Sequence, residues 1–285
     1  MQRVLVSQKQ TPSPFLKWAG GKTQLLGELQ SHVPSFQTYY EPFLGGGALF
    51  FRLASCKSDF RAYLSDLNAE LVNAYRVVKH DVEELICNLS QHEKDYSGDP
   101  EGFYYELRDA RPRSRIEKAG RLVALNKTCY NGLYRVNSIG AFNVPMGRYR
   151  NPLICNTAQL RNANAALART KASIRTCDYA AALSKAKKGD FVYLDPPFVP
   201  LSRTSSFVSY TRDGFSASDQ GLLAKIYRSL HRKGCRVLLS NSDTKLAREL
   251  YSDFEQFRIE ASRAISCKGD ARTGYTELLV RNYTP

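Results

Sequence analysis

Strand-like segments followed by helix-like segments recur near both ends of this 285-residue chain, and this order restricts the fold more than any other feature. In the first half, strands are predicted for TYYEPF (38–43) and FRAYLSDLN (60–68). A glycine turn that opens a helix, LGGGALFFRLA (44–54), follows the first strand, and a helix, AELVNAYRVVK (69–79), follows the second. Strands alternating with helices in this way are the unit of a parallel sheet. We therefore expect an α/β fold.

The alternation returns in the second half, after a middle part of different character. Strands are predicted for ASIRTCDY (172–179), DFVYLDPPF (190–198) and CRVLLSNSD (235–243), a helix for 216–234, and a closing strand pair for 257–266 and 275–283. Residues 80–125 instead look helical and charged, and 130–150 predict an irregular loop with a β-hairpin. We expect a sheet domain made of residues 1–75 and 163–285, interrupted by an inserted, mostly helical domain at 76–162.

The chain is strongly basic, and the charge is concentrated in its middle. The net charge is +14 and the isoelectric point is about 9.5. Between residues 107 and 161 there are eleven Lys or Arg residues and two acidic ones, a net charge of +9. A basic surface of this kind most often contacts a polyanion, and nucleic acid is the first candidate.

Several classes of protein are disfavoured by the composition. No apolar run approaches the ~20 residues that span a bilayer, and the N-terminus does not resemble a signal peptide. The nearest two of the seven cysteines are 22 positions apart, so no zinc-binding spacing is present. We expect a cytoplasmic protein with reduced thiols, without a metal site and without membrane contact.

The segment GGKT (20–23) looks like the end of a nucleotide-binding P-loop, but its context does not fit. The motif requires a glycine at position 16, where this chain has Leu16. It should also follow a buried strand, whereas the preceding run SQKQTPSP is polar and contains two prolines. An ATPase or GTPase is therefore not predicted.

The tetrapeptide DPPF (195–198) is the strongest chemical feature. It follows FVYL, an apolar strand-like run, and two consecutive prolines end a strand and stiffen the chain after it. A carboxylate at the carboxyl end of a parallel strand lies where α/β sheets bind ligands. Acceptors from Asp195 and Pro196, with the ring of Phe198, fit a planar heterocycle that bears an amino group.

The turn EPFLGGG (41–47) is the second such feature. Glycines between a strand and a helix let a ligand approach the backbone and leave helix N–H groups free. Asp66 follows nineteen residues after Gly47, at the end of the next predicted strand, where an acid can bind ribose hydroxyls. Together they predict a cofactor that contains adenosine.

The order of these motifs resembles the Dam-type DNA N6-adenine methyltransferases. The resemblance rests on FLKWAGGK, EPFLGGG, LSDLN and DPPF, with a basic insertion before the last, and covers nearly the whole chain. The segment NKTCYNGLYRVNSIGAFNVPMGRY (126–149) looks like the target-recognition hairpin of the members that methylate adenine in GATC. The resemblance implies a Rossmann-like methyltransferase sheet with helices on both faces.

The resemblance also implies a role for particular residues. The catalytic residues would be Asp195, Pro196, Pro197 and Phe198, and of these Asp195, Pro196 and Phe198 would hold the flipped adenine. S-adenosylmethionine, which leaves as S-adenosylhomocysteine, would be bound by Trp18, Lys22, Glu41, Pro42, Phe43, Gly45, Gly47, Asp66, Asp178 and Asp195. Double-stranded DNA would be contacted by Lys17, Arg113, Lys127, Tyr130, Asn131, Leu133, Arg135, Asn143, Pro145, Arg148 and Tyr149. Phe198 stands where the family more often has tyrosine, and its ring can still stack.

Two other functions remain open at this point. A methyltransferase acting on N4 of cytosine would use a related set of acceptors, and a catalytically inactive DNA-binding protein would share the basic surface. We expect the enzyme to act as a monomer, with a cognate restriction endonuclease as a possible functional partner.

Overall fold

The computed structural model describes residues 11–57, 59–197, 215–261 and 275–285. Its centre is a seven-stranded sheet in the order β3-β2-β1-β4-β5-β7-β6. The first five strands of that order are parallel, and β7 pairs antiparallel with both β5 and β6. The strands are β1 (Thr38–Glu41), β2 (Arg61–Asp66), β3 (Ser173–Thr176), β4 (Phe191–Leu194), β5 (Arg236–Ser242), β6 (Glu255–Ala261) and β7 (Tyr275–Arg281). The predicted α/β class is confirmed, and a strand lies in each of the seven predicted segments; residues 262–266 of the segment predicted at 257–266 lie outside the described residues.

Helices cover both faces of the sheet, because alternate strand residues face opposite sides. Tyr39, Phe191 and Tyr193 belong to an apolar cluster with α1 (Leu26–Ser31), α2 (Ala48–Cys56), α3 (Ala69–His80) and α7 (Thr157–Arg169). Their neighbours Tyr40 and Val192 belong to a second cluster with α8 (Tyr179–Leu183), α9 (Ala217–Arg232) and α10 (Lys245–Leu250). Helices on both faces were expected from the family resemblance, and this expectation is confirmed.

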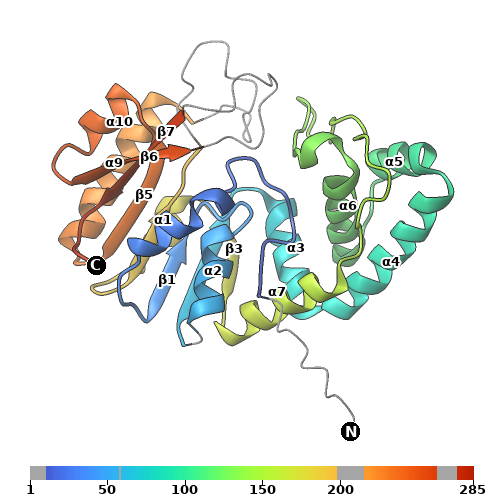
Figure 1. Cartoon of the computed structure of the whole chain (residues 1–285), viewed down its shortest axis with the longest axis horizontal. Coiled ribbons are helices and arrows are strands. Elements are labelled where there is room, and N and C mark those ends of the chain that lie inside the picture. The colour runs from blue at the N-terminus through green and yellow to red at the C-terminus, as the bar shows by residue number, and fades with distance from the viewer. Residues whose placement is uncertain (1–10, 58, 198–214, 262–274) are drawn as a thin grey trace, which may run out of the picture.

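The middle of the chain is helical and lies at one end of the molecule (Figure 1). It contains α4 (Val82–Gly98), α5 (Pro100–Asp109) and α6 (Arg115–Thr128), and α6 packs on α3 and α4. Buried residues of these helices share one continuous apolar cluster with the first face of the sheet. The boundaries expected near residues 75 and 162 fall inside α3 and α7. The division into two domains stays a prediction.

The segment after α6 is irregular, with one turn of 3-10 helix, η2 (Tyr130–Gly132), at its start; a second, η1 (Thr23–Leu25), precedes α1. Isolated antiparallel bridges join Cys129 to Met146 and Val136 to Phe142. Arg135 and Asn143 flank the second bridge, and the backbone N–H of Asn143 donates to the Arg135 carbonyl at 3.0 Å. The expected hairpin is therefore a pair of antiparallel arms held by a few contacts. We call residues 126–149 the recognition segment, after its expected role.

Candidate active site

The parallel strands end at one edge of the sheet, and acidic residues expected at the site end or directly follow three of them. From β1 the chain continues to β2 and β3 on one side, and β4 and β5 lie on the other side. The loops after the neighbouring strands β1 and β4 therefore diverge, and such a switch point is where α/β sheets bind ligands. Glu41 ends β1, Asp66 ends β2, and Asp195 directly follows β4. The fold thus brings EPFLGGG and DPP to one place.

Asp195 is the centre of a cluster of polar side chains. Its Oδ1 atom lies 3.0 Å from Lys22 Nζ and accepts a 3.0 Å hydrogen bond from the Ser240 hydroxyl. Lys22 is only 4% exposed, and its Nζ also lies 3.3 Å from Glu277 Oε2 on β7. Burial raises the pKa of Asp195, while Lys22 and Ser240 oppose this shift by stabilising the ionised form. The glycine-lysine pair of GGKT therefore places an ammonium group beside Asp195.

The glycine turn is fixed by Asp66 and by close packing. The backbone N–H groups of Gly45 and Asn68 donate to the two carboxylate oxygens of Asp66 at 3.0 and 2.9 Å. Gly45 has a φ of +48°, and a Cβ atom there would lie 2.9 Å from the Trp18 ring. Gly47 has a φ of +64°, and its Cβ would lie 2.7 Å from the Tyr75 hydroxyl. No larger residue fits at either position without displacing an aromatic side chain.

Glu41 is buried within the same region. Its Oε2 accepts a 3.0 Å hydrogen bond from the Tyr39 hydroxyl. Burial raises the pKa of Glu41 to about 8, and the nearby negative charge of Asp195 acts in the same direction. The carboxyl group is therefore mostly protonated at neutral pH, and it can donate a hydrogen bond as well as accept one.

The other residues expected around the cofactor lie in the same loops. Pro42 is buried, and Phe43 stacks on Tyr179 of α8 with ring centroids 5.2 Å apart. Asp178 is exposed and caps α8, because its carboxylate accepts a 2.9 Å hydrogen bond from the Ala181 N–H. In the DPPF motif, Pro196 is buried and Pro197 is half-buried. Phe198 lies outside the described residues.

The residues expected to bind DNA lie in or beside the recognition segment, with Arg113 exposed just before α6. Lys17 is held by Asn126, which accepts from the Lys17 N–H and donates to the Lys17 carbonyl, both at 2.8 Å. The Lys17 ammonium also lies 5.0 Å from the centre of the Tyr149 ring. The fold thus joins two DNA-binding candidates that are far apart in the sequence.

Arg135 and Asn143 form a second pair within the segment. The Arg135 guanidinium donates to the Asn143 side-chain and backbone oxygens at 2.7 and 3.0 Å, and Arg135 stays exposed. Tyr130 is 47% exposed, and Asn131 has a φ of +54°. Leu133 packs against the core, and burial lowers the pKa of Lys127. Of the remaining candidates, Pro145 and Arg148 are exposed.

Reasoning from the sequence missed several polar residues that support the site. Ser240 and Glu277 contact Asp195 and Lys22, as described above. The side chain of Asn241 donates to Gln220 at 2.9 Å, and Gln220 donates to the Pro197 carbonyl at 3.4 Å. Asn241 and Gln220 are both almost fully buried. The run SNS at the end of an otherwise apolar strand was the available signal, because buried polar side chains require partners.

Within the described ranges, no three His, Cys, Asp or Glu side chains are grouped to hold a metal ion. The helices of those ranges are all too short or too polar to cross a bilayer.

Comparison with known protein families identifies the chain. Residues 18–265 match the model of the D12 class N6 adenine-specific DNA methyltransferases. The chain belongs to this family. The match covers EPFLGGG, LSDLN, the basic middle part and DPPF, and it includes FLKWAGGK from Trp18 onward. It supports adenine rather than cytosine as the methylated base. The chain is thus an enzyme of the family that methylates N6 of adenine in DNA.

Individual relatives agree with the family match. The chain is 44% identical to the Type II methyltransferase M1.LlaDCHI of Lactococcus lactis subsp. cremoris, over 95% of both chains. It is 42% identical to the Type II methyltransferase M.MjaIII of Methanocaldococcus jannaschii, over 95% of this chain and 99% of that one. It is 35% identical to the DNA adenine methylase of Escherichia coli strain K12, over 93% of each.

Proposed function

We propose that this chain is a site-specific methyltransferase that moves a methyl group from S-adenosylmethionine to N6 of a flipped-out adenine in the duplex sequence GATC. The observation that carries the proposal is the position of Asp195. It lies at the switch point of the sheet, next to the glycine turn, and is held by Lys22 and Ser240. The GATC sequence is proposed from the likeness of the recognition segment to that of the GATC enzymes.

The residues at the switch point fit S-adenosylmethionine by their chemistry. The turn after β1 would accommodate the methionine part, with Trp18 packed on Gly45. Asp66 would accept hydrogen bonds from the ribose hydroxyls through lone pairs that its two backbone donors leave available. Asp178 lies at the end of the neighbouring strand β3 on the same edge of the sheet. When bound, the cofactor supplies an electrophilic methyl group on a sulfonium.

The chain's own residues would activate the amino group of adenine. The nitrogen is a poor nucleophile because its lone pair is shared with the ring. Ionised Asp195 and the Pro196 carbonyl would accept hydrogen bonds from its two N–H groups. These hydrogen bonds favour a pyramidal nitrogen and stabilise positive charge as the new C–N bond forms. Lys22 helps to keep Asp195 ionised for this task. One proton leaves the nitrogen after transfer, and S-adenosylhomocysteine is the second product.

Residues 76–162 would form the DNA-binding part. An enzyme that acts on a base inside a duplex has to flip that base out of the stack, at a cost of a few kcal/mol. Tyr130, Asn131 and Leu133 would fill or border the vacated space, Arg135 would read a guanine, and Pro145 and Tyr149 would approach the other half of the site. Because two relatives are Type II methyltransferases, we propose that a restriction endonuclease with the same target sequence acts beside this enzyme.

The test is methylation of a mixed pool of DNA duplexes with tritiated S-adenosylmethionine and sequence-resolved detection of N6-methyladenine. We expect modification at GATC alone, and a rate lower by about 10²–10³ with the Asp195→Ala variant, the typical cost of losing one such acceptor. Binding of S-adenosylhomocysteine by the variant would show that its site is intact. Modified adenine in another sequence would overturn GATC, and normal turnover by the variant would overturn the role of Asp195.

A further inference from the structure

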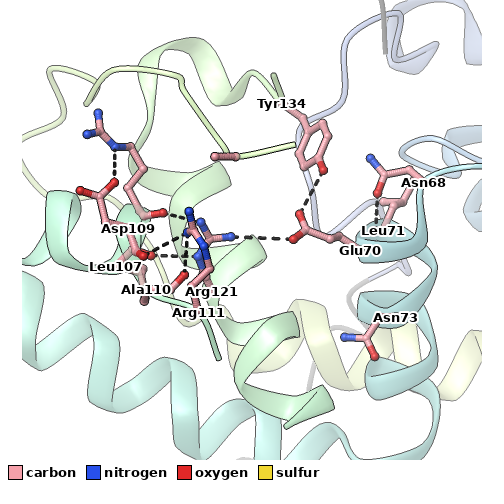
Figure 2. A network of polar contacts seen from close by, with 12 residues as sticks. Asn68, Glu70, Leu71, Asn73, Leu107, Asp109, Ala110, Arg111, Arg121 and Tyr134 are labelled. Atoms are coloured by element: carbon pink, nitrogen blue, oxygen red, sulfur yellow. Dashed lines mark hydrogen bonds and ion pairs between the residues drawn. The ribbon is translucent and has the colours of Figure 1, made fainter. Parts of the chain in front are cut away.

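Tyr134 connects the recognition segment to both parts of the expected cofactor site. Its ring stacks on Trp18, with centroids 5.3 Å apart and an angle of 25° between the planes. Its hydroxyl donates a 3.0 Å hydrogen bond to Glu70 Oε2 near the start of α3 (Figure 2). Trp18 packs on Gly45 of the glycine turn, and α3 begins directly after the loop that follows Asp66. One side chain thus contacts Trp18, which packs on the glycine turn, and Glu70, which follows the Asp66 loop.

The neighbours of Tyr134 in the sequence are two of the residues proposed to contact DNA. Leu133 and Arg135, expected at the target sequence, adjoin it directly. The Tyr134 ring also meets Phe142 of the opposite arm edge-to-face, with centroids 5.9 Å apart. A shift of Tyr134 would therefore move the backbone that carries both neighbours.

Glu70 is held in turn by the helices of the middle part (Figure 2). Arg121 of α6 is buried, and its guanidinium lies 3.8 Å from Glu70 Oε1. The same guanidinium donates to the carbonyls of Leu107 and Arg108 at the end of α5. Burial lowers the pKa of Arg121, while the charge of Glu70 raises it, so the acid stabilises a buried cation. The chain of contacts runs from the glycine turn through Tyr134 and Glu70 into α5 and α6.

We infer that Tyr134 is a positioning residue that couples cofactor binding to target recognition, with Glu70 as its anchor. The inference rests on the proposed function, since it takes the glycine turn as the cofactor site and residues 126–149 as the DNA reader. A bound cofactor that orders the glycine turn and Trp18 would favour one position of the Tyr134 side chain. That position would hold Leu133 and Arg135 where they can contact the target sequence. Linkage then requires that bound DNA tightens cofactor binding by the same factor.

The experiment measures this factor directly by titration calorimetry. The affinity for S-adenosylhomocysteine is measured with and without a duplex that carries the sequence methylated by the wild type in the pool assay. We expect a ratio of at least fivefold for the wild type, at the lower end of typical coupling between sites. In Tyr134→Phe, which keeps the stacking ring and loses only the hydroxyl, the ratio should fall to between one and two.

A matched control is available in Tyr104. Its hydroxyl donates a 2.8 Å hydrogen bond to the Val144 carbonyl, so Tyr104→Phe also removes one tether of the recognition segment, to α5 instead of to the start of α3. The control should keep the wild-type ratio. Glu70→Ala should lower the ratio as Tyr134→Phe does, and the double variant should lose no more than either single variant.

The outcomes separate the two proposals. If the wild type binds no S-adenosylhomocysteine, or methylates no defined sequence, the proposed function fails. If the wild type binds both ligands with a ratio near one, or if folded Tyr134→Phe keeps the wild-type ratio, the coupling role of Tyr134 is overturned. A control variant that loses the ratio equally would also overturn it, because any loosening of the segment would then suffice.

Discussion

Lys22 forms two ion pairs in a position that solvent hardly reaches, and removing its charge should alter the pH dependence of catalysis. Asp195 has to be ionised to accept a hydrogen bond from the adenine amino group, and its pKa is already raised by burial. Without Lys22 the ionised form would lose its main stabilising partner, so the pKa would rise further. In Lys22→Met, we therefore expect the acid limb of the kcat/KM profile to move to higher pH. An acid limb at the wild-type position, even with a lower rate, would contradict this role.

Glu41 should make the folded protein less stable as pH rises. Its pKa is about 8 in the folded state against an ordinary value of 4.5, so the folded chain holds an extra proton between these values. Stability falls with rising pH wherever the folded state binds more protons than the unfolded state. Glu41→Gln has no such proton, so its unfolding free energy should fall less from pH 5 to 8, by up to about 4 kcal/mol. Denaturant titrations without cofactor at each pH measure this, and parallel curves for both proteins would refute it.

The candidate acids could be predicted from the sequence because each follows a recognisable strand. Their partners could not, since Ser240 reaches Asp195 through the pairing of β4 with β5, and Glu277 reaches Lys22 through the pairing of β5 with β7. Lys22 was expected only to bind the cofactor, and its contact with Asp195 joins residues 173 positions apart in the sequence. Tertiary contacts of this kind leave no local pattern.

At the level of elements, an arginine of the recognition segment and one outside it should differ in what their loss does to DNA recognition. Arg135 lies on one antiparallel arm and is oriented by Asn143 on the other, whereas Arg113 is exposed at the approach to α6. Arg135→Ala should relax the preference for one guanine by about 1–3 kcal/mol, whereas Arg113→Ala should weaken binding to all sequences alike. Methylation rates on GATC and on duplexes changed at one guanine measure both effects. Full discrimination by Arg135→Ala would contradict its role as a reader.

The strands were predicted more completely than the helices. Strands β1, β4 and β5 are short apolar runs with clear breaks after them, and burial on both faces requires such runs. The helix α7 was not predicted, because Asn162 and Asn164 lower its helix propensity. Asn164 instead donates two 2.9 Å hydrogen bonds to the carbonyls of Val78 and Lys79 at the end of α3. Its helical state is therefore favoured by a contact that only the folded chain provides.

For the whole molecule, the +9 stretch should make DNA binding strongly dependent on salt. Eight of its eleven basic side chains are exposed: Arg111, Arg113, Arg115, Lys118, Arg135, Arg148, Arg150 and Arg161. Each phosphate contact contributes about −0.9 to the slope of log K against log salt concentration. We expect a slope of about −5 or steeper for nonspecific duplex, which corresponds to roughly six contacts. Affinity that is flat between 50 and 200 mM salt would contradict a phosphate-binding surface.

The sheet order also determines when the enzyme can first become active during its own synthesis. The strand that precedes the glycine turn, β1, pairs on one side with β2, which is made soon after it, but on the other side with β4. A ribosome adding about 5–20 residues per second needs roughly 8–30 s to progress from Tyr39 to its partner Phe191. During this time one edge of β1 has no native neighbour, and exposed strand edges promote aggregation. Because Asp195 follows β4, the nascent chain gains its reactive carboxylate at the same moment that it covers this edge.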